Sequence, residues 1–216
     1  MKIKICGLRR LYDGEAALAA GADLVGVVFY PPSPRYLPPE EARRLLAALR
    51  ERFPTRRWGA VGVFVNAPVE QVNAVAAACD LDFVQLHGTE DVAYCAQIAR
   101  PVIKALRLHE LPSPGEFAQR GAAAWGAARL LIDAAVPGRW GGTGQTYDWQ
   151  QARPYAREAL MAGGLTPDNV AEAVQVMAPW GLDVSSGVER EGWKDARLIE
   201  AFIVHARQAA AALADL

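Results

Sequence analysis

Cysteine and aspartate side chains stand at the ends of two apolar segments of this 216-residue chain. Cys6 closes the run "KIKIC" at residues 2–6, and Asp133 follows the apolar triplet "LLI". A free thiol has a pKa of roughly 8.5, and a nearby cation lowers it toward useful basicity. A carboxylate at the end of a buried strand is costly unless it is paired or used. Both are candidate reactive groups, although a small buried cysteine and a loop-ordering aspartate are the plainer interpretations.

Two glycine-containing segments late in the chain have the composition of a phosphate site. "AGGL" at 162–165 and "DVSSGVE" at 183–189 each follow an apolar run. Backbone N–H groups must approach a phosphate closely, and a helix N-terminus adds a favourable dipole. Either segment alone could simply end a strand, but the two together favour phosphate binding by Gly163, Gly164, Ser185, Ser186 and Gly187.

Arg35 lies in the proline-rich segment "YPPSPRYLPPEE". Prolines restrict the backbone there, and the planar guanidinium can hold a carboxylate through two hydrogen bonds. Arg35 therefore suits a ligand carboxylate. Before any further evidence, a surface ion pair with Glu40 or Glu41 is the simpler interpretation.

Two other residues invite a chemical role. His87 ends the run "VQLH" and could be a general base, but His109 and His205 are the only other histidines, too few for a multi-histidine metal site. Lys104 could form a Schiff base, although an internal ion pair is the better expectation.

Short strand-like segments alternate with Ala-, Leu- and Glu-rich helical segments along the whole chain. Eight such βα units within about 200 residues predict one (βα)8 TIM barrel domain spanning residues 1–216, with an open doubly wound sheet as the main alternative. In such barrels function sits at the C-terminal ends of the strands. Two helical segments, "TEDVAYCAQIA" and "TPDNVAEAVQVMA", begin with a threonine suited to an N-cap. The expected strands are residues 2–6, 22–30, 58–66, 82–88, 101–108, 128–135, 157–164 and 182–187.

Composition excludes several classes of function. The formal net charge is −1, and Lys and Arg are scattered among acids, so no nucleic acid partner is expected. No signal-peptide pattern and no membrane-length apolar run are visible. Three dispersed cysteines are too few for a disulfide framework or a zinc site, so a cytoplasmic protein with reduced thiols is expected.

The motifs together resemble the phosphoribosylanthranilate isomerase family. The similarity runs in order from residue 2 to about residue 195, through "KIKICGLRR", "GVVFYPPSPRYL", "GVFVN", "VQLHG", "GGTGQTYDW", "AGGLTPDNV" and "LDVSSGVE". It implies a (βα)8 barrel without metal or organic cofactor. It also implies an Amadori rearrangement in tryptophan biosynthesis, with a phosphorylated ribosyl anthranilate as the small-molecule substrate. The oligomeric state, monomer or homodimer, stays open.

The resemblance assigns roles to individual residues. Cys6 resembles the general base, Asp133 the general acid and Arg35 the group that meets the anthranilate carboxylate. Gly163, Gly164, Ser185, Ser186 and Gly187 match the phosphate-binding strand ends. Two dipeptides depart from the family pattern, Arg9-Arg10 after the base and Arg139-Trp140 before the glycines Gly141, Gly142 and Gly144.

The alternation of side chains along residues 2–6 predicts that Lys4 and Cys6 point into the barrel. Asp183, a further candidate for the substrate site, is expected inward on the neighbouring last strand. We therefore expect an ion pair between Lys4 and Asp183 beneath Cys6. Gly7 is expected to leave room for the substrate beside the thiol.

Two other functions remain open from the sequence. The related histidine-pathway isomerase performs the same type of rearrangement, but it typically has an aspartate where this chain has Cys6, and it needs two phosphate sites where only one is evident here. A non-catalytic barrel that binds a phosphorylated ligand is the alternative from a different class.

Overall fold

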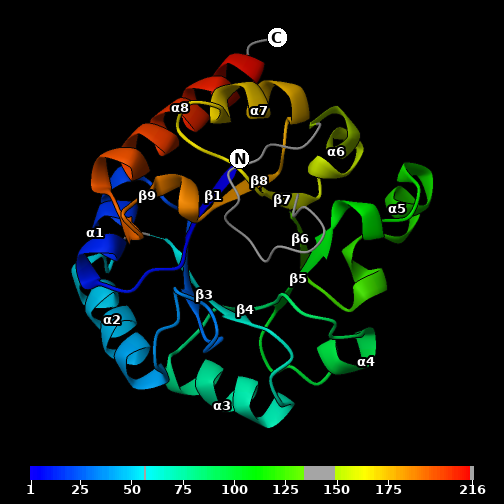
Figure 1. Ribbon diagram of the computed structural model, residues 1–216. Helices are drawn as coiled ribbons and strands as arrows, with labels where there is room; N and C mark the ends of the chain where they lie inside the picture. The colour runs from blue at the N-terminus through cyan, green and yellow to red at the C-terminus, as the bar shows by residue number, and fades with distance from the viewer. Residues whose placement is uncertain (56, 134–148, 215–216) are drawn as a thin grey trace.

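Eight parallel strands close into a barrel in the order of the sequence, from β1 round to β8 (Figure 1). The computed structural model describes residues 1–55, 57–133 and 149–214. β1 pairs with both β2 and β8, which closes the ring. The strands are β1 (Lys2–Cys6), β2 (Leu24–Val28), β3 (Gly59–Phe64), β4 (Phe83–Leu86), β5 (Val102–Arg107), β6 (Arg129–Asp133), β7 (Ala159–Ala162) and β8 (Gly181–Val184).

Helices surround the barrel and cover its outer surface (Figure 1). They are α1 (Leu11–Ala20), α2 (Pro39–Arg52), α3 (Val69–Ala78), α4 (Val92–Cys95), α5 (Pro114–Arg120), α6 (Trp149–Ala156), α7 (Val170–Met177) and α8 (Ala196–Ala214). Short 3₁₀ turns η1 (Leu108–Glu110), η2 (Ala122–Trp125) and η3 (Ser186–Val188) join some of these elements. A two-stranded hairpin, β9 (Glu189–Arg190) and β10 (Trp193–Lys194), precedes α8. Among the described residues, none of the helices is both long and apolar enough to cross a membrane.

The strands are buried on both faces, as parallel strands covered by helices must be. One face packs against the helices in a large apolar core, in which β1 contributes Ile3 and Ile5. The other face fills the barrel interior with a smaller cluster that includes Val61, Leu131 and Leu160. The polar side chains that share this interior therefore have to be paired.

The alternation of segments predicted both the closed barrel and the position of every barrel strand. The two threonine N-caps were wrong. Asp91 caps α4, where its carboxylate accepts the N–H of Tyr94, and Asn169 occupies the N-cap position of α7. The last strand also ends earlier than expected, because the chain turns into η3 at Ser186.

Candidate active site

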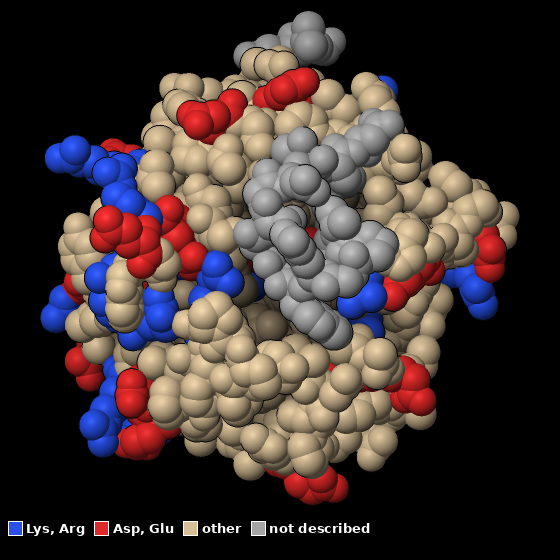
Figure 2. All heavy atoms as spheres, in the orientation of Figure 1, with Lys and Arg blue, Asp and Glu red and all other residues tan. Residues whose placement is uncertain are grey.

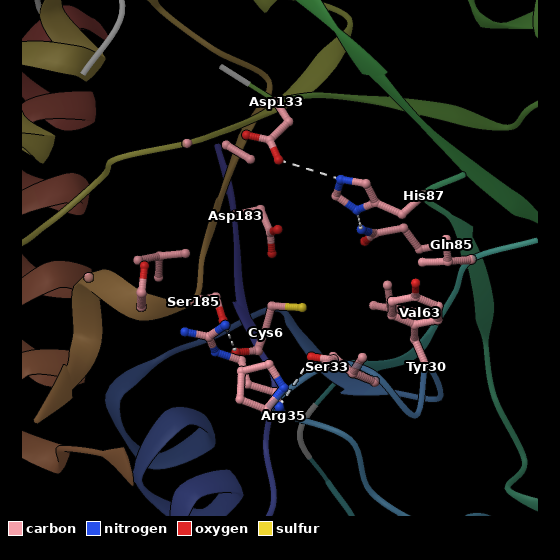
Figure 3. Close-up of a pocket in the computed structure, with 18 of the residues that line it drawn as sticks. Cys6, Tyr30, Ser33, Arg35, Val63, Gln85, His87, Asp133, Asp183 and Ser185 are labelled. Carbon is pink, nitrogen blue, oxygen red and sulfur yellow. Dashed lines mark hydrogen bonds and ion pairs between the residues drawn. The ribbon is translucent and has the colours of Figure 1, made fainter. Parts of the chain in front are cut away.

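A cavity of about 380 Å³ opens at the C-terminal ends of the strands and gathers all the predicted site residues (Figure 3). β1, β6 and β8 contribute residues at or near their ends, and the loops after β2, β7 and β8 contribute the others. The barrel topology thus brings together residues that are up to 181 positions apart. The predicted residues on its wall are Cys6, Arg35, Asp133, Gly163, Gly164, Asp183, Ser185, Ser186 and Gly187.

The predicted ion pair beneath the thiol is present. Lys4 lies directly opposite Asp183 in the parallel pairing of β1 with β8, and their side chains meet at 2.9 Å from Nζ to Oδ1. Burial alone would lower the pKa of Lys4, but the charge of Asp183, and then that of Cys6, raise it. Lys4 is therefore a fixed cation in the barrel interior, directly beneath the cavity.

The thiol of Cys6 points into the open part of the cavity (Figure 3). Gly26 makes room for it, because a Cβ at Gly26 would lie 2.9 Å from the Cys6 sulfur. Burial raises the pKa of the Cys6 thiol, and the Lys4 ammonium opposes this only in part. The expectation that a cation would bring the pKa of this thiol below its ordinary value was therefore wrong, because desolvation of the thiolate outweighs the attraction of Lys4.

Replacing Lys4 with methionine is expected to raise the pKa of the Cys6 thiol further. The thiolate loses its nearest cation, so the proportion of thiolate at a given pH falls. The variant should also lose about 3 kcal/mol of stability, because Asp183 keeps a buried charge without its partner. Alkylation rate as a function of pH measures the thiol, and urea unfolding measures the stability.

Lys104→Met is the matched control for this variant. Lys104, on β5, is like Lys4 a buried lysine on a barrel strand, and its Nζ lies 2.8 Å from Oε2 of Glu90. Its loss should destabilise the fold without moving the Cys6 titration, since it is not among the groups that shift that thiol. An unchanged thiol pKa in Lys4→Met would contradict the electrostatic interaction between Lys4 and Cys6. The observed Lys104–Glu90 pair also agrees with the ion pair expected from the sequence for Lys104.

Asp133 ends β6 on another side of the cavity from Cys6 (Figure 3). Its Oδ2 lies 3.4 Å from Nε2 of His87, which follows β4. His87 Nδ1 in turn lies 3.1 Å from Nε2 of Gln85. Sequence reasoning considered His87 only as a possible base and did not identify Gln85, although alternation along "VQLHG" places both on one face.

Arg35 is held by an acid that the sequence did not indicate. Its Nε and Nη2 donate to the two carboxylate oxygens of Glu189, at 2.8 and 2.7 Å. The alternative ion pair with Glu40 or Glu41 is absent, since Arg35 pairs with Glu189 and Glu40 binds Arg43 and Arg44. Burial alone would raise the pKa of Glu189, but its bonds to Arg35 and to Lys194 lower it.

Gly7 makes room for Arg35. Its φ of +80° lies in the left-handed region, and a Cβ there would come 2.6 Å from Cδ of Arg35. The space beside Gly7 is therefore filled by the Arg35 side chain rather than left for the substrate, and Arg35 itself lines the cavity.

Lys194 connects Glu189 to the end of β8. Its Nζ, which is buried, donates to Oε1 of Glu189 at 2.6 Å and to the backbone carbonyl of Ser185 at 3.0 Å. The Ser185 hydroxyl donates to the carbonyl of Cys6 at 3.0 Å. A continuous chain of polar contacts thus runs from Arg35 through the hairpin to the predicted phosphate-binding segment and to β1.

Arg9 and Arg10, the dipeptide that departs from the family pattern, bind that hairpin to the neighbouring loops. Both guanidinium groups stack on the ring of Trp193, at 3.9 and 4.6 Å from its centroid. Arg9 also donates to the carbonyl of Pro34 at 2.9 Å, and Arg10 to that of Lys194 at 3.0 Å. The pair therefore joins the loops after β1 and β2 to the hairpin that carries Glu189.

The glycines after β7 and β8 occupy positions where a side chain would be strained or would collide with the backbone. Gly163 and Gly164 have φ values of +98° and +66°, which side-chain-bearing residues rarely adopt. A Cβ on Gly187 would collide with the carbonyl of Leu165. Larger residues are therefore disfavoured at these positions, where the loops after β7 and β8 meet.

Part of the segment that departs from the family pattern or is rich in glycine lies outside the described residues, namely Arg139, Trp140, Gly141, Gly142 and Gly144. Within the part of the chain that the structure describes, no three His, Cys, Asp or Glu side chains gather so as to hold a metal ion.

The cavity wall thus combines an arginine, glycine-rich strand ends, a thiol and the carboxylate group of Asp133. A model of the N-(5'-phosphoribosyl)anthranilate (PRA) isomerase family matches residues 3–205. The chain belongs to this family.

Curated PRA isomerases are similar over nearly their whole length. The one from Roseiflexus sp. (strain RS-1) is 45% identical, covering 97% of this chain and 99% of the relative. The one from Geobacter metallireducens is 43% identical, covering 96% and 99%.

Solved structures of PRA isomerases agree in fold. The Thermotoga maritima enzyme is 39% identical, with a TM-score of 0.82 over 96% of this chain and 99% of that chain. A PRA isomerase in complex with reduced 1-(o-carboxyphenylamino)-1-deoxyribulose 5-phosphate is 37% identical, with a TM-score of 0.77 and the same coverage. The expected (βα)8 barrel and the expected isomerase of tryptophan biosynthesis are therefore confirmed.

Proposed function

We propose that this cavity binds N-(5'-phosphoribosyl)anthranilate and converts it to 1-(2-carboxyphenylamino)-1-deoxyribulose 5-phosphate by an Amadori rearrangement. The observation that carries the proposal is the order of groups around the cavity. Arg35 stands beside Cys6, and the glycine-rich ends of β7 and β8 complete the wall (Figure 3). A carboxylate and a phosphate are the two anions of this substrate, and the sugar that joins them has to pass Cys6 and Asp133.

Asp133 acts as the general acid in the first step. Its proton goes to the ring oxygen of the ribose, the bond from that oxygen to C1' breaks, and the lone pair of the anthranilate nitrogen forms a double bond to C1'. The products of this step are an open-chain Schiff base with a protonated nitrogen and the Asp133 carboxylate.

Cys6 acts as the general base in the second step. Its thiolate removes the proton from C2', and the C–H electron pair forms a C1'–C2' double bond as the nitrogen becomes neutral. The resulting enolamine tautomerises to the ketone, so atoms and electrons balance without an external oxidant or reductant. The Schiff base is cationic, and the Lys4–Asp183 pair beneath it is close to neutral overall.

Binding is assigned to the remaining residues of the wall. Arg35 binds the carboxylate of the substrate through the part of its guanidinium that does not donate to Glu189. Gly163, Gly164, Ser185, Ser186 and Gly187 bind the phosphate through the loops after β7 and β8. Asp183, which lies between Cys6 and Asp133 in Figure 3, contacts the ribose.

Loss of the substrate's fluorescence on mixing with the purified protein tests the proposal directly. We expect turnover by the unmodified chain without added metal. Tight binding of the substrate with no turnover would instead identify a non-catalytic phosphate-binding barrel. Turnover of only the histidine-pathway substrate would favour the related isomerase.

Three further expectations belong to this proposal: one domain over residues 1–216, a cytoplasmic location, and no nucleic acid partner. The three cysteines are free and buried, which suits a reducing compartment. On the face in Figure 2, Lys and Arg side chains lie beside Asp and Glu rather than in one basic patch. A solved structure that is 36% identical shows generated monomers of the dimeric PRA isomerase of Thermotoga maritima.

A further inference from the structure

A line of polar side chains joins the interior lysine to Asp133. Lys4 Nζ donates to Oε1 of Gln85 at 2.8 Å, and Nε2 of Gln85 lies 3.1 Å from Nδ1 of His87. His87 Nε2 lies 3.4 Å from Oδ2 of Asp133 (Figure 3). Gln85 and His87 are alternate residues at the end of β4, so both face the barrel interior.

Lys4 determines which way round the Gln85 amide lies. An ammonium group can only donate hydrogen bonds, so the amide oxygen must face it and the NH₂ must face His87. That NH₂ group also only donates, so Nδ1 of His87 has to be the acceptor. The neutral imidazole then carries its proton on Nε2, which faces Asp133.

We propose that Lys4 and Gln85 fix His87 in the Nε2–H tautomer, and that His87 thereby positions Asp133 for proton donation. This rests on the proposed function, in which Asp133 is the acid. In this proposal Nε2–H donates to Oδ2 of Asp133 across the 3.4 Å contact, so the transferable proton is carried on Oδ1.

The same bond favours the proton transfer energetically. Before transfer, Nε2–H donates to a neutral carboxyl group. After transfer it donates to a carboxylate, and hydrogen bonds to ionised groups are roughly twice as strong as neutral ones. The contact therefore strengthens as negative charge develops on Asp133, which lowers the barrier to ring opening. His87 and Gln85 are positioning residues in this scheme, because they act through Asp133.

The tautomer can be read from ¹⁵N NMR of the unmodified protein, without turnover. We expect His87 to show a protonated Nε2 and an unprotonated Nδ1. His205 is an internal reference of the opposite kind, because its Nδ1 lies 2.7 Å from the carbonyl oxygen of Pro167 and must donate to it. A His87 spectrum with Nδ1 protonated would overturn the proposal, whether or not the enzyme is active.

Gln85→Glu tests the control of the tautomer with a side chain of nearly the same shape. A carboxylate accepts from Lys4 as the amide oxygen does, but it also accepts from His87, so the proton should move to Nδ1. We expect kcat to fall roughly 10- to 100-fold, the range of a lost hydrogen bond to a charged group, with a smaller change in KM. If Nδ1 is protonated in this variant and kcat is unchanged, the tautomer of His87 does not control proton donation by Asp133, and the proposal is overturned.

His87→Gln is the conservative variant that completes the test. A glutamine amide can donate to Asp133 from near the Nε2 position and has no tautomer to control. It should retain more activity than His87→Ala, and adding Gln85→Glu to it should have a much smaller effect than in the unmodified protein. Equal effects of Gln85→Glu in both backgrounds would overturn the proposal.

Discussion

Replacing Cys6 with serine is expected to lower kcat/KM by roughly 10²- to 10⁴-fold, the contribution of a positioned general base. Serine keeps the size of the side chain, so the loops after β1 and β2 should stay in place. Its hydroxyl is far less acidic than a thiol and supplies no base at neutral pH. KM should change little, because the anion-binding groups are untouched. Steady-state kinetics with the fluorescent substrate measures both parameters.

Cys79→Ser is the matched control. Cys79 is also buried, and its sulfur contacts the carbonyl of Pro39 at 3.3 Å, away from the cavity. A serine hydroxyl can keep that contact, so near-normal activity is expected. An active Cys6→Ser variant would remove Cys6 from the role of base while leaving the isomerase assignment intact.

The state of the Cys6 thiol also predicts a pH dependence. Burial raises its pKa above that of a free thiol, and the base must be the thiolate. Activity requires the deprotonated form, so kcat/KM should still be rising with pH at pH 9. A profile that becomes flat below neutral pH would mean that the thiolate is stabilised by something other than Lys4.

Replacing Asp133 with asparagine should cause a loss of kcat/KM of the same order, roughly 10²- to 10⁴-fold. Asparagine has nearly the same shape and can keep an oxygen facing Nε2 of His87, so the geometry around β6 is preserved. It has no acidic proton, and opening of the ribose ring then depends on water. Single-turnover kinetics should show that substrate binds but that the first chemical step is slow.

Asp82→Asn controls for the loss of a carboxylate elsewhere in the barrel. Asp82 precedes β4 at the other end of the strands, where its Oδ2 accepts the N–H of Ala60 at 2.7 Å. Asparagine can accept the same bond, and turnover should be close to normal. Full activity of Asp133→Asn would be evidence that another group, His87 being the nearest, delivers the proton.

The sequence predicted the barrel and the residues that line its cavity because both follow from local patterns. Period-two alternation in "KIKIC" places Lys4 and Cys6 on one face. Once β1 is taken as the neighbour of β8, Asp183 is the acid that can reach Lys4. Glycines and serines after β7 and β8 mark the strand ends themselves. Each of these inferences needs only residue types and their order along the chain.

The remaining features depend on distances that no local pattern contains. Glu189 reaches Arg35 across 154 positions in the sequence, through a hairpin of two-residue strands that carries little strand signal. Gln85 is read from the sequence as a polar residue in an apolar strand, and its role depends on which atoms Lys4 and His87 present to it. The thiol pKa depends on a balance between burial and charge, which requires the packed structure.

The bonds among Arg35, Glu189, Lys194 and Ser185 have a consequence for ligand selection. In the proposed function they connect the group that binds the carboxylate to the loop that binds the phosphate. The separation between the two anion-binding positions is therefore set by the protein before the ligand arrives. A ligand must match that span, so molecules with the same two end groups but a longer or shorter spacer are excluded by length, whatever the chemistry of their middle.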